Sequence, residues 1–262
     1  MTGLPPELRD GAMATKRARR LLVALDFDGT LAPFVDDPAD ARALPASARA
    51  IEELILAPDT VVAMVSGRSL ASLRQVASPD PRVLLVGSHG AERYAPAEYG
   101  AADLAADLSL EAAETLGAAH LELVDLAQTH SGAWVEEKPA GLVLHTRMVE
   151  PAAIPGLIHE ATTRMQALGD GVHITLGKNV VEISVLPADK GQGLDWLRAT
   201  TQADVVVFAG DDRTDENAFV RLDPASGDLG VKVGGGDTSA QYRVDGPGDV
   251  AVLLGTLADV RH

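Results

Sequence analysis

Two aspartates stand two positions apart near the start of the sequence, in the string Asp26–Thr30. They end the apolar run that begins at Leu21, and Gly29 lets the backbone open into a loop directly after them. A carboxylate pair at a strand end can bind a hard divalent cation and leave one oxygen free to attack phosphorus. The alternatives are a metal site without a nucleophile and a solvated turn. The other motifs of the chain have to distinguish between these three possibilities.

Groups that could bind a phosphate follow two other segments. Ser66-Gly67-Arg68 ends the run Thr60–Val65 and precedes a predicted helix, so the Ser66 hydroxyl and several free backbone N–H groups could face an anion. Lys190 stands just before another predicted helix and could supply a positive charge. Taken singly, such a turn and such a lysine are common without any ligand.

Several carboxylates are concentrated in Gly210–Glu216, which ends a further apolar run. Capping of the next helix explains one of them, but a partly buried group of four would repel strongly if nothing compensated it. A bound cation removes that repulsion. The segment therefore predicts a metal site.

The apolar runs that end at these groups are typical of buried parallel strands in an α/β sheet. Five such strands are predicted, at Leu21–Phe27, Thr60–Val65, Arg82–Val86, Asp204–Ala209 and Leu229–Val233. Four of them end at a loop that carries functional groups. Three of these loops are described above, and the other is Gly87–Gly90. Ligands of open parallel sheets bind outside the carboxyl ends of the strands, so one site is expected at that edge.

The pattern changes between about Leu104 and Leu186. Two helices and four strands are predicted there, at Leu104–Gln128, Ala133–Lys138, Gly141–Met148, Pro151–Leu168, Val172–Leu176 and Val180–Val185. We therefore predict an α/β core with a parallel sheet, formed by 21–103 and 187–262, an inserted α+β domain at 104–186, and a flexible N-terminal arm at 1–20.

Charge and composition exclude several classes of protein. The 262 residues carry a formal net charge of −16, which repels nucleic acid, anionic membranes and phosphate esters alike. A phosphorylated substrate would need a metal or a local basic pocket. The absence of cysteine excludes disulfides, thiol catalysis and thiolate metal sites.

The apolar run after Lys16–Arg20 is too short for a signal peptide, and no run approaches the ~18 residues of a membrane span. We expect a cytoplasmic monomer without nucleic-acid or membrane partners. Whether Met1 or Met13 begins the native chain is left open.

In their order along the chain, the four motifs resemble those of the haloacid dehalogenase (HAD) superfamily of phosphohydrolases, with Asp26–Leu31 as the strongest marker. Further features resemble the family of trehalose-6-phosphate phosphatases. These are Val65–Arg68, Gly87–Glu92, Glu136–Lys138, His145–Arg147, Lys178 with Glu182, and Gly210–Glu216. Thr146 departs from that family, which commonly has an aromatic residue there.

The resemblance implies a Rossmann-like core, a cap, and Mg²⁺-dependent hydrolysis of trehalose 6-phosphate through an aspartyl-phosphate. It makes Asp26 the nucleophile and Asp28 the acid and base. It assigns the metal to Asp26, the main-chain carbonyl of Asp28, and Asp211, with Asp212 and Asp215 as auxiliary groups. The phosphoryl oxygens are assigned to Ser66, Gly67 and Lys190, and the substrate contacts to Arg68, His89, Glu136, Lys138, Arg147, Lys178 and Glu182.

Alternatives stay open at this point. The polar groups that alternate on three strands of the insert are also what a solvated sheet face looks like, and His145 could merely support Arg147. A related sugar phosphatase acting on sucrose phosphate or a glycosyl-phosphoglycerate is the main competing enzyme. A receiver-type phosphoacceptor domain is disfavoured because its acidic pair precedes the phosphoacceptor and because it lacks such an insert. A sugar-binding protein without catalysis is disfavoured by the intact acidic groups.

Overall fold

The computed structural model describes residues 3–100, 102–104, 108–177, 179–186 and 189–262. The chain divides into two compact units. The first consists of Met1–Leu104 with Asp189–His262, and the second is Ala105–Ala188. None of the described helices is long and apolar enough to cross a lipid bilayer.

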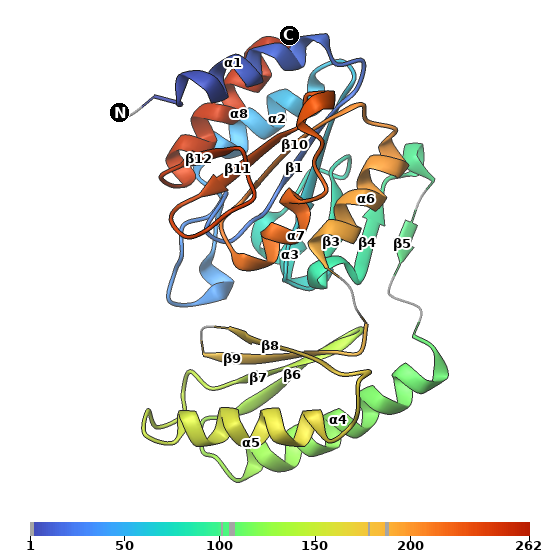
Figure 1. Cartoon of the computed structure of the whole chain (residues 1–262), viewed down its shortest axis with the longest axis vertical. Coiled ribbons are helices and arrows are strands. Elements are labelled where there is room, and N and C mark those ends of the chain that lie inside the picture. The colour runs from blue at the N-terminus through green and yellow to red at the C-terminus, as the bar shows by residue number, and fades with distance from the viewer. Residues whose placement is uncertain (1–2, 101, 105–107, 178, 187–188) are drawn as a thin grey trace. The chain divides into compact units, whose positions relative to one another are not determined.

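An eight-stranded sheet forms the centre of the first unit, in the order β12-β11-β10-β1-β2-β3-β4-β5 (Figure 1). The strands are β1 Leu21–Leu25, β2 Thr60–Val65, β3 Leu84–Gly87, β4 Glu92–Ala95, β5 Ala102–Leu104, β10 Val205–Gly210, β11 Leu229–Val233 and β12 Tyr242–Val244. The strands from β12 to β3 are parallel, whereas β4 and β5 are antiparallel to their neighbours. The prediction of an α/β fold with a mostly parallel sheet is confirmed.

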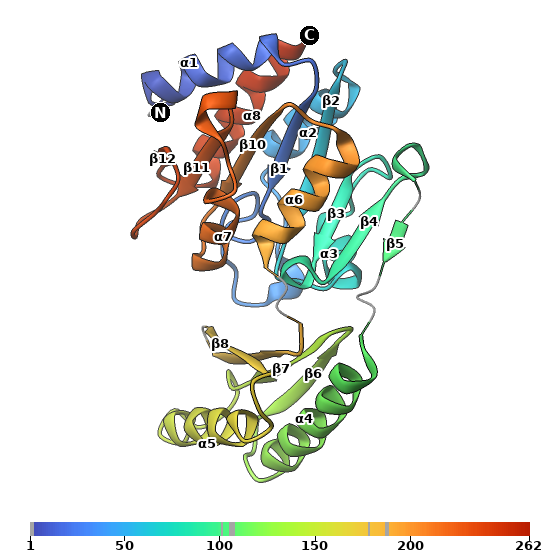
Figure 2. The same cartoon turned by 45° about the vertical axis from the view of Figure 1, so that its right-hand side comes forward.

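Helices cover both faces of this sheet, as Figures 1 and 2 show. One face packs against α1 Pro6–Ala14, α2 Pro45–Leu56, α3 Leu70–Ala77 and α8 Pro247–Arg261, and the other against α6 Lys190–Thr201 and α7 Glu216–Phe219. Strand β1 shows why the sequence folds in this way. Leu21, Val23 and Leu25 join the first core cluster and Leu22 and Ala24 the second, because side chains alternate along a strand. A strand covered on both faces is therefore apolar throughout.

The prediction of a flexible arm at residues 1–20 was wrong. Helix α1 occupies part of it, and Leu4, Leu8 and Ala12 are buried in the core cluster that includes β1 and α8. Leu8 and Ala12 lie four positions apart and therefore share one face of this helix, and Leu4 packs into the same cluster just before the helix begins. This apolar pattern is short and stands next to the basic run Lys16–Arg20, so the sequence alone did not indicate a buried helix.

The second unit has a four-stranded antiparallel sheet in the order β6-β7-β9-β8. Its strands are β6 Trp134–Lys138, β7 Gly141–His145, β8 His173–Gly177 and β9 Val180–Ser184. Helices α4 Leu110–Gln128 and α5 Ile154–Gln166 lie on one face of the sheet (Figure 1). Residues of both helices form a core with alternate residues of β7 and β9, including Leu123, Leu157, Leu144 and Val181.

Helix α4 begins later than the predicted Leu104. Residues 102–104 form the edge strand β5, and Ser109 caps the helix, its Oγ accepting from the backbone N–H of Ala112 at 3.1 Å. Serine at this position satisfies one of the free N–H groups of the first turn, so it fixes the start of the helix.

Candidate active site

Lys190 lies in the first turn of α6 and joins two carboxylates. Its Nζ donates to Oδ1 of Asp26 and to Oδ1 of Asp215, each at 2.7 Å. All three side chains are buried. Asp26 directly follows β1, and Asp189 caps α6 by accepting from the N–H of Gln192, so strand end and helix start bring these charges together. Buried charges are costly unless they are paired, and here each is.

The charges in this group do not balance. Burial raises the pKa of Asp26 well above its ordinary value, and the carboxylates of Asp215 and Asp211 raise it further, against the attraction of Lys190. Although burial by itself lowers the pKa of Lys190, the two carboxylates outweigh it and raise the value. The single positive charge of Lys190 thus lies among three carboxyl groups, those of Asp26, Asp211 and Asp215. A further cation would hold Asp26 in its ionised form.

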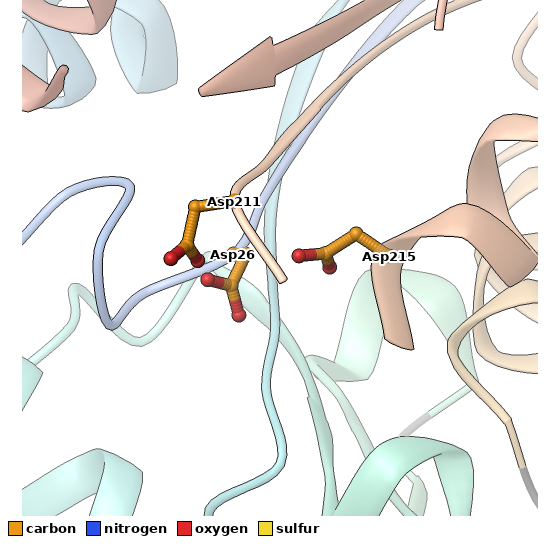
Figure 3. A group of neighbouring side chains, drawn as sticks. All are labelled: Asp26, Asp211 and Asp215. Carbon is orange, nitrogen blue, oxygen red and sulfur yellow. The ribbon is translucent and has the colours of Figure 1, made fainter. Parts of the chain in front are cut away.

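Three carboxylates converge into a possible metal site, formed by Asp26, Asp211 and Asp215 (Figure 3). One oxygen of each lies within 4.8 Å of the others. Asp211 Oδ1 is buried, and no described group donates a hydrogen bond to it. Burial, together with Asp215, raises the pKa of Asp211 to about 6. An unpartnered acceptor among converging carboxylates fits a hard divalent cation, which takes oxygen ligands.

Two glycines allow these carboxylates to approach so closely. Gly29 has a φ of +80°, and a Cβ there would lie 2.2 Å from Asp211 Oδ2. A Cβ on Gly210 would lie 2.3 Å from Asp215 Cγ. The sequence indicates Gly29 only as a residue that opens the loop. Its close approach to Asp211 could not be predicted, because that contact joins segments far apart in the chain.

Asp212, another acidic residue of the motif, has a different environment. The backbone N–H of Asp212 donates to Asp215 Oδ2 at 2.8 Å, and the Asp212 carboxylate in turn accepts from the backbone of Asp215. This reciprocal pair caps the short 3₁₀ helix Arg213–Asp215. Asp212 therefore holds the loop, whereas Asp215 belongs to the converging carboxylates.

The Asp28 carboxylate is held by Arg68. Arg68 Nε lies 2.6 Å from Oδ2 and Nη2 lies 2.7 Å from Oδ1, a fork-like pairing that uses both carboxylate oxygens. Nη2 also donates to the main-chain carbonyl of Pro38 at 2.8 Å. The two sequence motifs at the ends of β1 and β2 thus meet side by side.

The phosphate-binding candidates meet at the same edge of the sheet. Ser66 is buried at the end of β2, and its Oγ accepts from the backbone N–H of Arg68 at 3.1 Å. The backbone N–H of His89 donates to the Ser66 carbonyl at 3.1 Å. A Cβ on Gly67 would lie 2.5 Å from His89 Cε1, so the imidazole packs directly on the glycine.

Lys232 is a buried residue of this region that sequence reasoning did not single out. It lies in β11, and its Nζ donates to the main-chain carbonyls of Asp211 and, at 3.3 Å, Asp212. Glu216 Oε1 is 3.9 Å away. Lys232 therefore fixes the backbone that presents Asp211. A single charged residue inside an otherwise apolar strand is the signal that could have revealed it.

The predicted sugar contacts of the second unit lie mainly on its sheet. Glu136 Oε2 lies 2.9 Å from His145 Nε2, and Lys138 Nζ lies 3.8 Å from Glu182 Oε1. These four residues share the face opposite α4 and α5, in agreement with strand alternation. The hydrogen bond from His145 lowers the pKa of Glu136.

Two other expectations concern residues off these strands. Arg147 is exposed in the turn after β7, and Lys178 lies outside the described residues. Thr146, where an aromatic residue was expected, is completely buried, and its Oγ1 has no partner in the part of the chain that the structure describes.

Comparison with known proteins decides the family. The family model described as trehalose-phosphatase matches residues 24–247, which include all of the motifs above. The chain belongs to the trehalose-phosphatase family. The predicted membership of the HAD superfamily is confirmed with it.

Relatives and solved structures of the trehalose-phosphatase family agree with this assignment. The trehalose-phosphate phosphatase of Mycobacterium avium (strain 104) is 34% identical over 258 residues, which cover 92% of this chain and 63% of that protein. The trehalose-6-phosphate phosphatase of Aspergillus fumigatus has a TM-score of 0.69 at 25% identity, covering 99% of each chain. The C-terminal domain of the Candida albicans enzyme shows the same fold, with a TM-score of 0.80 at 24% identity, covering 99% of this chain and 98% of that one.

The chain spans only part of several curated relatives. An uncharacterized glycosyl hydrolase of Mycobacterium tuberculosis (strain ATCC 25618 / H37Rv) is 32% identical over 253 residues, which are 92% of this chain but 18% of that protein. The trehalose-phosphatase region therefore also occurs within a much longer protein.

Proposed function

We propose that this chain hydrolyses trehalose 6-phosphate to trehalose and inorganic phosphate in a Mg²⁺-dependent reaction. The observation that carries the proposal is the buried pairing of Lys190 with Asp26 and Asp215, beside Asp211, in a chain of the trehalose-phosphatase family. A phosphoryl group requires a nucleophile and positive charge at one point, and these side chains supply both.

Asp26 is the proposed nucleophile. Its carboxylate attacks phosphorus, the bond from phosphorus to the sugar oxygen breaks, and an aspartyl-phosphate is formed. Lys190 holds Oδ1 of Asp26 and so fixes the orientation of the carboxylate. Water then attacks the phosphorus of the aspartyl-phosphate, which releases phosphate and restores Asp26.

Asp28 is the proposed acid and base. It gives a proton to the departing sugar oxygen and then takes one from the attacking water. Arg68 orients this carboxylate through two hydrogen bonds, one of which comes from Nη2, a donor that is also shared with the main-chain carbonyl of Pro38. We propose that a phosphoryl oxygen takes over this donor, which makes Arg68 a substrate contact.

The phosphoryl oxygens are proposed to bind Ser66, the backbone N–H of Gly67, and Lys190. An ammonium group has three N–H bonds, and two of those of Lys190 are used by Asp26 and Asp215. The third is left for the phosphoryl group. His89 packs on Gly67 and is proposed to contact the substrate beside it.

Asp26, the main-chain carbonyl of Asp28, and Asp211 are the proposed ligands of Mg²⁺, with Asp215 close by and Asp212 holding the loop. When bound, Mg²⁺ neutralises the charge between the nucleophile and the phosphoryl oxygens. The unpartnered Oδ1 of Asp211 and the raised pKa of Asp26 support this assignment.

The second unit is proposed to be the cap that selects the sugar. We assign it the contacts to hydroxyl groups, through Glu136, Lys138, Arg147, Lys178 and Glu182. The polar sheet face opposite its helices supports this assignment. A cytoplasmic monomer acting on a small sugar phosphate, without nucleic-acid or membrane partners, is proposed from the charge of −16 and the absence of cysteine.

A panel of phosphate esters tests the proposal. Phosphate release is measured from trehalose 6-phosphate, sucrose 6′-phosphate, glucosyl-3-phosphoglycerate and p-nitrophenyl phosphate, with Mg²⁺ and after chelation. The largest kcat/KM is expected for trehalose 6-phosphate, and chelation is expected to stop the reaction. A larger kcat/KM for another sugar ester would change the proposed substrate. If none of the four esters released phosphate, the proposal of catalysis would be refuted.

A further inference from the structure

Trp134 is a prominent side chain of the second unit to which the proposed chemistry assigns no role. It begins β6 and is 49% exposed, although tryptophan is on average one of the more buried residues. Trp134 and Glu136 stand two apart on the same strand and therefore share a face. The other face of this sheet packs against α4 and α5 (Figure 1). Trp134 thus lies among the polar groups rather than in the core.

The indole ring is held in a fixed orientation. His145 is its direct register partner on β7, and the two rings stack with a centroid distance of 3.7 Å and an interplanar angle of 5°. His145 Nε2 in turn lies 2.9 Å from Glu136 Oε2. The carboxylate therefore orients the imidazole, and the imidazole supports one face of the indole. A ligand that binds here does not have to order these side chains, which saves entropy.

This arrangement has the chemistry of a pyranose site. One side of a pyranose ring presents C–H groups, which pack on an aromatic face, while its edge carries hydroxyl groups that need hydrogen-bond acceptors and donors. Since His145 covers one face of Trp134, the exposed part of the indole is left for a ligand, and Glu136 provides an acceptor two residues along the strand. The motifs that resemble known phosphatases assign sugar binding to charged side chains alone.

We propose that Trp134 is a specificity-determining residue that stacks on a hexopyranose ring, on a platform formed by Trp134, His145 and Glu136. The identity of that ring as part of trehalose rests on the proposed function. The stacking site itself does not, because it is read from the side chains of the second unit.

Fluorescence tests this directly, because the sequence contains only two tryptophans. In the full chain carrying Trp196→Phe, Trp134 is the sole source of indole emission. With Mg²⁺ present, titration with trehalose is expected to shift or quench this emission in a saturable way. Mannitol carries hydroxyl groups without a ring, so an equal concentration is expected to leave the emission unchanged.

Two substitutions separate stacking from simple burial of an apolar group. Trp134→Leu removes the aromatic face and is expected to weaken trehalose binding about tenfold in calorimetry, whereas Trp134→Phe keeps a ring and stays within about threefold of the parent. Thermal melting of both variants shows whether they are folded. The matched control is Glu137→Ala, which changes an exposed residue of the same strand on the opposite face and leaves the affinity as it was.

The outcomes distinguish this inference from the proposed function. Unchanged emission of Trp134 while calorimetry detects trehalose binding would overturn the stacking site, as would undetectable trehalose binding or an undiminished affinity of folded Trp134→Leu. Release of phosphate from trehalose 6-phosphate would leave the proposed function standing in each of these cases. Conversely, a saturable response of Trp134 to trehalose in a chain that releases no phosphate would support the site and refute the activity.

Discussion

Arg68 holds both carboxylate oxygens of Asp28, with Nε 2.6 Å from Oδ2 and Nη2 2.7 Å from Oδ1. The pair joins segments 40 positions apart, at the ends of two adjacent parallel strands. A planar guanidinium also prefers phosphate, and it can exchange one such partner for the other. In this structure Arg68 therefore orients the proposed acid and base, and we propose that a phosphoryl oxygen takes over one of these hydrogen bonds when the substrate binds.

Replacing Arg68 by lysine tests this exchange. Lysine keeps the charge but has no fork, so we expect both a higher KM and a lower kcat on trehalose 6-phosphate, with kcat/KM reduced about ten- to a hundredfold. Steady-state kinetics provides the measurement. Arg74→Lys, on α3 beside Tyr94, is the matched control and is expected to change little. Unaltered kinetics of the Arg68 variant would show that the fork has no role in turnover.

Asp26→Asn should lower turnover by several orders of magnitude. An amide oxygen can still accept from Lys190, so the fold is retained, but the amide cannot attack phosphorus and binds a cation poorly. Each tenfold loss corresponds to about 1.4 kcal/mol of barrier. Single-turnover phosphate release checks the rate, and thermal melting checks the fold. A variant that keeps a tenth of the parent kcat would rule out Asp26 as the nucleophile.

Mg²⁺ affinity should fall as the pH is lowered through about 6. The pKa of Asp211 is raised to about 6 and that of Asp26 is also raised, so in the metal-free protein these groups take up protons as the pH falls. A cation has to displace those protons, and its apparent affinity falls by up to about tenfold per pH unit for each proton displaced. Calorimetry with Mg²⁺ at pH 7 and pH 5 measures the effect. Equal affinities at the two values would mean that these carboxyls do not bind the ion.

Gly29→Ala is expected to impair the metal site more than the fold. The new Cβ would lie 2.2 Å from Asp211 Oδ2, so the carboxylate has to move, and activity should fall more than about a hundredfold with weaker Mg²⁺ binding. Gly236→Ala is a matched control, because Gly236 has a similar φ of +90° with nothing within 4 Å of its added Cβ. Both variants bear the cost of a positive φ, so the comparison isolates the steric contact. Equal losses of activity in Gly29→Ala and Gly236→Ala would show that the positive φ, and not the contact with Asp211, causes the effect.

Glu182→Ala and Lys138→Ala address the sugar contacts of the second unit. Their kcat/KM for trehalose 6-phosphate should fall much more than that for p-nitrophenyl phosphate, because the small ester has no sugar hydroxyls to lose. The ratio of the two values within one variant cancels errors in enzyme concentration. Glu137→Ala, on the opposite face of β6, should leave the ratio as it is. A parallel loss on both esters in the first two variants would contradict the assignment of specificity to this sheet.

The sequence predicted the five central strands because each is a largely apolar run, although Lys232 interrupts the last of them. It predicted the positions of Asp26, Lys190 and Asp211 because they follow such runs or resemble known motifs. The antiparallel edge was not predicted, since β4 consists of Glu92, Arg93, Tyr94 and Ala95 and has no apolar run. Contacts such as Lys232 with the Asp211 carbonyl could not be predicted either, because they depend on the order of strands in the sheet. Trp134 was overlooked for the same reason: its stacking partner stands on the neighbouring strand.

The order of strands also bears on how the chain folds. Strand β1 lies between β2 and β10, and β10 follows the whole second unit in sequence, so Leu21 pairs with Val205. Contacts that span so many residues form slowly, because a long loop has to close before they contribute. The second unit is built largely from neighbouring segments, such as β6 with β7, and such local pairs form early. During synthesis, β1 therefore keeps one unpaired edge until β10 emerges, and this edge is where we expect an incomplete chain to aggregate.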